Sequence, residues 1–283
     1  MTGTMTHPIA AVMGWPIAHS LSPRLHTAWL AHYGISGSYI PLAVAPEYLE
    51  QAVKALIPMG FQGCNVTVPH KTAVIPFLDD LTARASKIGA VNLIIVKNGR
   101  LIGDNTDGLG FAADVAPHLH MAPKKITILG AGGAAQAIFH ACLAYPELEQ
   151  LNLANRSIDK AEMLAEGNEK VQIYQWNDLT NICDDVDILV NTTTMGMTGH
   201  ESADWPPSDL QLDRLSPSAL VYDIIYAPFE TPLMKAARLQ GRQAQNGLGM
   251  LIEQARPSFE AFFGLMPDRL KGIEDELKAS LGA

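Results

Sequence analysis

The segment KITILGAGGAA, residues 125–135, decides the fold. Its first six residues form a short apolar run that is typical of a buried strand, and the run leads directly into a glycine-rich turn. The turn has the spacing G-x-G-x-x-A, carried by Gly130, Gly132 and Ala135. Between a strand and a helix, the first glycine permits the tight turn, the second lets the backbone approach a pyrophosphate, and the alanine keeps the helix close to the sheet. The segment therefore predicts an α/β domain that binds a dinucleotide.

The helix after this turn would direct free N–H groups and a partial positive charge at a bound phosphate. The predicted contacts are the six consecutive residues of the turn: Gly130, Ala131, Gly132, Gly133, Ala134 and Ala135. The alternative interpretation is a glycine-rich turn that only packing requires. The strand before the turn and the helix after it favour dinucleotide binding over that alternative.

The next predicted strand indicates which dinucleotide binds, because it runs into LANRSIDK, residues 153–160. An NAD enzyme usually has Asp or Glu at this strand end, about 20 residues after the glycine turn, to hold the ribose 2′-hydroxyl. Here Asn155 takes that place and Arg156 follows, and a guanidinium can pair with a 2′-phosphate and stack on adenine. Ser157 offers a hydroxyl, although it also suits the N-cap of the next helix, and Arg156 could simply be a solvated cation. We expect NADP rather than NAD.

The rest of the chain alternates short apolar strands with helices that have one apolar face. Strands are expected at 9–13, 38–44, 61–68, 91–96, 100–103, 125–130 and 150–155, and in VQIY, DILVN and LVYDI further on. Helices are expected at 22–33, 47–57, 108–119, 157–166, 231–241, 248–263 and 267–281, with one more after Gly132. Ser22 is the expected N-cap of the first helix, and Asn98-Gly99 predicts a hairpin turn. This alternation implies parallel sheets with right-handed crossovers.

The composition limits the classes of function. A chain of 283 residues with 48% hydrophobic residues has room for two ordinary domains, and a net charge of −9 argues against a nucleic-acid partner. The three cysteines are widely spaced and form no C-x-x-C motif, so a disulfide framework is not expected. We see neither a signal peptide nor an apolar run of membrane-spanning length. We therefore expect a cytoplasmic protein with no membrane partner, either a monomer or a homodimer.

Polar residues gather where predicted strands end. The stretch NVTVPHK, residues 65–71, alternates as a strand would and then reaches Lys71, while Asp107 follows another strand and precedes a helix. The ends of neighbouring strands converge at one edge of an open α/β sheet, so Lys71 and Asp107 could meet across a small cleft. Taken alone, Asp107 would usually be a helix N-cap. His118-x-His120 lacks evident partners, so we expect no metal site.

Taken together, these segments resemble the shikimate dehydrogenase family, nearly from end to end. The matching stretches are GWPIAHSLSPRLH (14–26), NVTVPHK (65–71), AVN (90–92), GDNTDGLG (103–110), GAGGAA (130–135), NRS (155–157), NTTTMGM (191–197), DIIYAPFETPL (223–233) and NGLGMLIEQA (246–255). The resemblance implies an N-terminal substrate domain, an inserted Rossmann-type NADP domain, and C-terminal helices that return to the first domain. It places the substrate domain at 1–107 plus 247–283 and the NADP domain at 108–246.

The resemblance also implies an activity and the residues that carry it. Family members reduce 3-dehydroshikimate to shikimate with NADPH, in the route to aromatic amino acids. The implied catalytic pair is Lys71 and Asp107. The residues implied to bind the substrate are Ser20 and Ser22 at its carboxylate, Tyr226 nearby, and Thr67, Asn92 and Gln254 at the ring. Beyond the glycine turn, the implied cofactor contacts are Asn155, Arg156, Ser157, Thr192, Met197, Gly247 and Met250.

Two features depart from the family pattern. Ser157 replaces the threonine of an N-R-T signature and keeps its hydroxyl, and NTTTMGM differs by small polar changes from the usual N-A-T-S-x-G-M.

In the expected chemistry, Lys71 donates a proton to the developing alkoxide, and Asp107 orients Lys71. The first alternative is a quinate/shikimate dehydrogenase with relaxed cofactor use. The second is a non-catalytic ligand sensor on the same scaffold, which the presence of both Lys71 and Asp107 disfavours.

Overall fold

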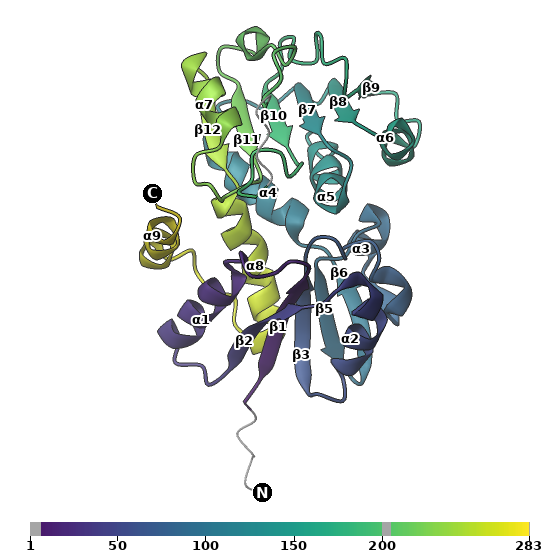
Figure 1. Cartoon of the computed structure of the whole chain (residues 1–283), viewed down its shortest axis with the longest axis vertical. Helices are drawn as coiled ribbons and strands as arrows, with labels where there is room; N and C mark the ends of the chain where they lie inside the picture. Colours follow the sequence, from purple (N-terminus) through teal and green to yellow (C-terminus); the bar gives the residue numbers. More distant parts are fainter. Residues whose placement is uncertain (1–6, 200–204, 283) are drawn as a thin grey trace, which may run out of the picture. The chain divides into compact units, whose positions relative to one another are not determined.

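The computed structural model describes residues 7–199 and 205–282, which fold into two compact units. The first unit contains the described residues through Asp107 together with Leu251–Leu277. The second contains Gly108–Met250 and the segment from Lys278. The second unit is thus inserted into the first along the chain. Figure 1 follows the chain through both units.

The first unit is built on a six-stranded sheet with the order β2-β1-β3-β5-β6-β4. Its strands are β1 (Ile9–Gly14), β2 (Ser38–Ala43), β3 (Phe61–Val66), β4 (Asp80–Leu81), β5 (Leu93–Lys97) and β6 (Arg100–Asp104). The sheet is mixed, because β5 runs antiparallel to both β3 and β6. The prediction of a parallel sheet is therefore wrong here. The hairpin at Asn98 and Gly99 reverses the chain between β5 and β6. Both residues have the positive φ that the predicted turn requires, +53° and +70°.

Alternation along β1 sends side chains to two separate cores. Ala10 and Val12 pack on one face with Phe262, and Ala11 and Met13 pack on the other with a larger apolar cluster. The helices of this unit are α1 (Ser22–His32), α2 (Leu49–Ala55), α3 (Ala83–Ile88), the later part of α8 (Leu248–Phe263) and most of α9 (Lys271–Ser280). In Figure 1, α1 and α8 cover one face of the sheet, and α2 and α3 cover the other.

The second unit is a six-stranded sheet with the order β12-β11-β10-β7-β8-β9, and every pairing in it is parallel. Its strands are β7 (Lys125–Leu129), β8 (Gln150–Asn155), β9 (Val171–Gln175), β10 (Ile188–Asn191), β11 (Leu220–Asp223) and β12 (Gln243–Asn246). Numbered from β7, this is the order 3-2-1-4-5-6 of a Rossmann fold, whose crevice lies between the first and fourth strands. The predicted Rossmann-type domain is confirmed.

Helices cover both faces of this second sheet. They are α4 (Asp107–Val115), α5 (Gly133–Cys142), α6 (Ile158–Ala165), α7 (Pro232–Leu239) and the first turn of α8. One core packs Phe111 of α4, Phe139 of α5 and Met250 of α8 against the sheet. The other packs Leu233 and Ala237 of α7. Four short 3₁₀ helices complete the described structure: η1 (Pro46–Tyr48), η2 (Ile75–Phe77), η3 (Ala116–His118) and η4 (Leu212–Arg214).

Several predicted boundaries shift. The strand expected at 61–68 ends at Val66, and Val68 is 59% exposed. The helix expected at 108–119 is α4 followed by η3, and the one expected at 267–281 starts at Lys271. The pattern did not predict α3, β4 or β12. Ser22 is not the N-cap of α1, because it is already the first helical residue and Leu21 precedes it in the cap position.

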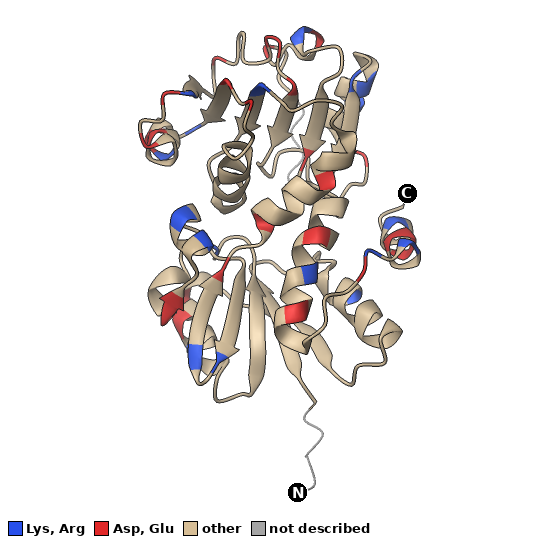
Figure 2. Ribbon diagram, turned by 180° about the vertical axis from the view of Figure 1, so that it is seen from behind, with Lys and Arg blue, Asp and Glu red and all other residues tan. Residues whose placement is uncertain are grey.

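Charged residues lie mainly on helices and loops, and the strands of both sheets are mostly uncharged (Figure 2). Among the described residues, no helix is long and apolar enough to cross a membrane. Cys64, Cys142 and Cys183 are all buried free thiols. Burial raises the pKa of each thiol, that of Cys183 to about 12, so none is a good nucleophile near neutral pH.

Candidate active site

Lys71 and Asp107 lie together in the first unit. Lys71 follows the end of β3, and Asp107 is the first residue of α4. Lys71 Nζ donates to Asp107 Oδ2 at 2.6 Å, and the two side chains are only 14% and 5% exposed. An ammonium group has three donors, and this bond uses one. The pair therefore holds a cation in a fixed place with donors left for a ligand oxygen.

Asn92 connects this pair to other polar side chains. Its Nδ2 donates to Asp107 Oδ1 at 2.8 Å and to Gln254 Oε1 at 3.1 Å. Its Oδ1 accepts from the backbone N–H of Thr106 at 2.8 Å, and Thr106 Oγ1 donates to the carbonyl of Gln254 at 2.9 Å. Both oxygens of Asp107 are thus held by side chains of the first unit. The network fixes the orientation of the carboxylate that holds Lys71.

The backbone explains why Asp107 is free for this role. Its N–H donates to Asn105 Oδ1 at 3.0 Å, so Asn105 supplies the side-chain bond at the start of α4. The alternative that Asp107 serves only as a helix N-cap is wrong. Its carboxylate instead bonds Asn92 and Lys71, from segments that precede it by many residues.

The two serines lie on the segment between β1 and α1. Ser20 Oγ accepts from the backbone N–H of Ser22 at 3.3 Å, and the Ser22 side chain is mostly buried. The hydroxyls of Ser22 and Thr67 make no hydrogen bond to another residue of the described chain. A hydroxyl without an internal partner is available to a bound anion or ring hydroxyl.

Gly14 brings the segment after β1 against the segment after β3. A Cβ atom on Gly14 would lie 2.5 Å from Thr67 Cγ2, so only glycine permits this approach. The Trp15 N–H donates to the Val68 carbonyl at 3.0 Å. The structure thus joins the strand end before Ser20 and Ser22 to the one before Lys71. Tyr226 lies in the second unit, after β11, and its role at the substrate carboxylate stays a prediction.

The glycine-rich turn follows β7 in the second unit. Gly130 has φ +110°, and a Cβ there would lie 2.6 Å from Thr192 Oγ1. A Cβ on Gly132 would meet nothing within 4 Å, so the backbone at Gly132 faces open space. Helix α5 starts at Gly133 with no side-chain cap and no acidic residue in its first turn. Its first N–H groups have no intrahelical partner, and Ala135 is fully buried against the sheet. These features fit a phosphate.

Arg156 directly follows β8, the strand next to β7. It is exposed and forms no ion pair or hydrogen bond with the other described residues. Asn155 Nδ2 donates to the Ser157 carbonyl at 2.9 Å, which ties the strand end into the turn. Ser157 takes the N-cap position of α6 but makes no side-chain cap bond, so its hydroxyl is also available. A cation and a hydroxyl beside the phosphate-binding turn fit a 2′-phosphate.

The remaining predicted cofactor residues follow β10 and β12. Thr192 Oγ1 donates to the Leu129 carbonyl at 2.7 Å, so the segment after β10 lies against the end of β7. Met197 lies further along this segment. Gly247 follows β12, and a Cβ there would lie 2.0 Å from the Ile224 carbonyl oxygen. Met250 is buried in the core of the second unit.

Sequence reasoning missed some of the residues that shape these sites. Asn191, Asp223 and Asn246 are the last residues of β10, β11 and β12, and all three are buried. Each also accepts at least one backbone N–H bond from the segment that follows it. The signal was present in the sequence, because each of three short apolar or edge strands ends in Asn or Asp.

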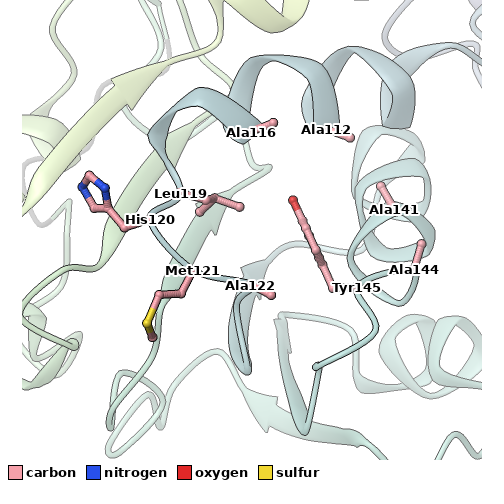
Figure 3. A pocket seen from close by; sticks show the side chains of 9 residues that line it. All are labelled: Ala112, Ala116, Leu119, His120, Met121, Ala122, Ala141, Ala144 and Tyr145. Carbon is pink, nitrogen blue, oxygen red and sulfur yellow. The ribbon is translucent and has the colours of Figure 1, made fainter.

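A separate cavity of about 570 Å³ lies beside the ends of α4 and α5 (Figure 3). It is lined by Ala112, Ala116, Leu119, His120, Met121, Ala122, Ala141, Ala144 and Tyr145. No carboxylate or fixed cation lines it, so it offers none of the groups that the paired site in the first unit provides. Within residues 7–199 and 205–282, no group of three His, Cys, Asp or Glu side chains could hold a metal ion.

Comparison with known proteins follows the same division of the chain. Residues 12–94 match the model of the shikimate dehydrogenase substrate binding domain, 112–199 that of shikimate/quinate 5-dehydrogenase, and 247–277 that of the shikimate 5′-dehydrogenase C-terminal domain. The shikimate dehydrogenase (NADP(+)) of Rhodospirillum rubrum is 46% identical over 96% of each chain. The chain belongs to the shikimate dehydrogenase family.

Solved structures agree with this family. The shikimate 5-dehydrogenase of Thermus thermophilus, in complex with NADP(H) and shikimate, is 32% identical with a TM-score of 0.84, over 97% of this chain and 100% of that one. A quinate dehydrogenase from Corynebacterium glutamicum, in complex with NAD, is 28% identical with a TM-score of 0.84, over 96% and 99%. The fold is thus shared by relatives named for different substrates and cofactors, so specificity depends on individual residues.

Proposed function

We propose that this chain catalyses the reversible, NADPH-dependent reduction of 3-dehydroshikimate to shikimate. The observation that carries the proposal is the Lys71–Asp107 pair, held at 2.6 Å and joined through Asn92 to Gln254. This arrangement presents a fixed ammonium donor in a largely buried place, which suits a reaction that develops negative charge on one oxygen. Names of relatives at 42–46% identity support the same activity.

The first unit is the proposed substrate unit. Ser20 and Ser22 bind the ring carboxylate, and Thr67 binds a ring hydroxyl through an oxygen that has no other partner in the described chain. Asn92 and Gln254 fix the ring and the Asp107 carboxylate together. The match of residues 12–94 to a substrate binding domain supports this assignment. We assign NADP binding to the second unit on its glycine turn and Arg156.

The chemistry is divided between the cofactor and the chain. NADPH, when bound, supplies the hydride that reduces the substrate carbonyl. Lys71 Nζ donates a hydrogen bond and then a proton to the oxygen that gains charge. Asp107 holds Lys71 in place and accepts a bond from the neighbouring hydroxyl. Because both side chains are more than four-fifths buried, water competes little for these bonds.

Arg156 and the lack of an acidic residue at position 155 support NADP as the cofactor. Glu or Asp at the end of β8 would bind a ribose 2′-hydroxyl and repel a 2′-phosphate, and the chain has Asn155 there. A cytoplasmic location belongs to the same proposal, supported by three buried free thiols. The oligomeric state, monomer or homodimer, also remains a proposal.

One assay tests the proposed function directly. Purified full-length chain is mixed with shikimate and NADP, and NADPH formation is followed by absorbance, with quinate and NAD as control substrates. We expect the highest kcat/KM for shikimate with NADP. Faster turnover of quinate, or a preference for NAD, would replace the proposal with the quinate dehydrogenase alternative. No turnover with any of the four combinations would favour a ligand sensor.

A further inference from the structure

Two neighbouring strands of the second unit each end in a buried polar residue that has no role in the proposed chemistry. Asn191 ends β10 and Asp223 ends β11, and both are 0% exposed. The two residues are paired in the sheet register, so their side chains lie at the same level. Asn191 Nδ2 donates to Asp223 Oδ1 at 3.0 Å. They form one polar contact between two strand ends.

Asn191 holds the segment that follows β10. Its Oδ1 accepts from the backbone N–H of Thr193 at 3.0 Å and from Thr193 Oγ1 at 2.7 Å. Thr193 Oγ1 in turn accepts from the Met195 N–H at 3.2 Å. The same segment begins with Thr192, which bonds the end of β7, and it continues to Met197.

Asp223 holds the segment that follows β11. Its Oδ1 accepts from the Ile225 N–H at 3.2 Å, and its Oδ2 accepts from Thr231 Oγ1 at 2.7 Å. The Ile225 carbonyl accepts from the Gly247 N–H at 3.1 Å, which attaches the segment after β12 as well. Burial raises the pKa of Asp223 to about 6, against the effect of its hydrogen-bond donors. A charged group this deeply buried requires those donors.

Sheet topology indicates what these segments would meet. Arg156 follows β8 and the glycine turn follows β7, so the adenosine end of a bound dinucleotide lies on the β8 side of the crevice. Its other half must then extend over the ends of β10, β11 and β12, which lie one, two and three strand spacings of about 4.8 Å from β7. Those are the strand ends that Asn191 and Asp223 hold.

We propose that Asp223, together with Asn191, is a positioning residue that holds the segments after β10, β11 and β12 against the nicotinamide half of NADP(H). The inference rests on the proposed function, because it takes NADP(H) as the ligand of the second unit. It adds that the nicotinamide side depends on a buried carboxylate that touches no ligand, while the adenosine side depends on the exposed Arg156.

The test compares two ligands on the full-length chain. NADPH spans the whole site, whereas adenosine 2′,5′-bisphosphate reaches only the adenosine side. For Asp223→Asn we expect the Kd of NADPH to rise roughly ten-fold, since a buried charged hydrogen-bond acceptor is lost. The Kd of the bisphosphate should stay within about two-fold of the unsubstituted chain. Both values are measured by calorimetry, with a melting curve for each variant.

Asp187→Asn is the control, because Asp187 is a partly buried carboxylate that also accepts backbone hydrogen bonds, at the opposite edge of the same sheet. It directly precedes β10, and its Oδ2 accepts from the backbone N–H groups of Lys124 and Lys125 at 2.8 and 3.0 Å. This variant should lower the melting temperature and leave the ratio of the two Kd values unchanged. A ratio that shifts equally in Asp187→Asn would show a general loss of stability and overturn the inference.

A second pair of variants keeps the inference testable if Asp223→Asn does not fold. Thr231→Val removes the hydroxyl that donates to Asp223 Oδ2, and Thr231→Ser retains it. We expect Thr231→Val to weaken NADPH more than the bisphosphate, and Thr231→Ser to restore the ratio. Equal weakening of both ligands, or no weakening of either, overturns the inference. If the unsubstituted chain binds neither ligand, the proposed function itself fails, which is a different result.

Discussion

The proposed catalytic residues of the first unit and the proposed cofactor-selective residue of the second unit differ in burial and in their bonding partners. In the first unit, Lys71 and Asp107 are already paired at 2.6 Å and almost buried. In the second, Arg156 lies exposed beside the phosphate-binding turn, with no ion-pair partner in the described chain. A buried charge without a partner is costly, whereas an exposed cation is solvated by water. The comparison shows that the proposed catalytic groups are held by partners within the chain, whereas the proposed cofactor-selective cation is exposed to solvent.

The largest effect is expected from a substitution that breaks the Lys71–Asp107 pair. Lys71→Ala should lower kcat by a factor of about 10² to 10⁴, because a positioned proton donor is lost. NADPH binding should change little, since the proposed NADP site belongs to the second unit, and the KM for shikimate should rise only modestly. Steady-state kinetics and NADPH titration measure these quantities.

Lys97→Ala is a suitable control for that variant, because Lys97 is an exposed lysine at the end of β5 in the same unit. It should leave both kinetic constants unchanged. If Lys71→Ala kept a normal kcat and raised only KM, Lys71 would bind substrate without taking part in the chemical step.

The next prediction concerns how stability depends on pH, and it compares one buried titratable group from each unit. In the first, His26 is fully buried, both ring nitrogens lack hydrogen-bond partners among the described residues, and burial lowers its pKa from 6.5 to about 3. Between pH 6.5 and about 3, the unfolded chain binds a proton that native His26 does not, so stability falls as pH falls. In the second unit, burial raises the pKa of Asp223 from 3.8 to about 6. Between these pH values native Asp223 binds a proton that the unfolded chain does not, so its contribution to stability rises as pH falls.

We expect His26→Phe to be less sensitive to acid. The difference in the free energy of unfolding between pH 7 and pH 4.5 should shrink by about 2–3 kcal/mol relative to the unsubstituted chain. Urea unfolding followed by tryptophan fluorescence measures it at each pH, and each variant serves as its own reference. Asp223→Asn should enlarge the same difference. An unchanged difference in His26→Phe would mean that the native imidazole becomes protonated at mildly acidic pH.

A smaller effect tests the exposed group of the second unit. Arg156→Ala should weaken NADPH by about 10- to 100-fold, the loss of one charged hydrogen bond or ion pair, and should change NADH little. Lys160→Ala tests whether any nearby cation contributes to NADPH binding, because Lys160 is also exposed and lies about one helical turn after Arg156 in the chain. Equal losses for NADPH and NADH in Arg156→Ala would contradict recognition of the 2′-phosphate.

Local sequence patterns predicted those parts of the fold that depend on nearby residues. The glycine turn, the hairpin at Asn98-Gly99 and the Thr231 cap of α7 are all present, because each needs only a few neighbouring residues. Strand β12 was missed because its sequence QAQN has little apolar pattern, and its structure comes from pairing with β11. The insertion of one unit into the other was predicted only through resemblance to a family.

The candidate site shows the same limit. Convergence of strand ends placed Lys71 near Asp107, but the bond from Asn92 to Gln254 joins residues 162 positions apart in the chain. Such a long-range contact leaves no periodic pattern in the sequence. Ser22 was predicted as a cap because serine favours that position, yet the helix starts one residue earlier and leaves its hydroxyl without a partner in the described chain.

The smallest expected effect is that of replacing Ser22. Because Ser22 is not a helix N-cap, its substitution separates substrate binding from stability within the first unit. Ser22→Ala removes a hydroxyl that caps no helix, so the melting temperature should stay nearly constant while the KM for shikimate rises by roughly ten-fold, with a larger rise when Ser20→Ala is added. Thr82→Ala is the crossed control, because Thr82 is a true N-cap whose hydroxyl accepts from the Ala85 N–H at 3.2 Å. Loss of that cap should cost about 1 kcal/mol of stability and leave KM unchanged. If Ser22→Ala lowered the melting temperature as Thr82→Ala does and left KM unaltered, the serine would be a structural residue, and the carboxylate would need another anchor.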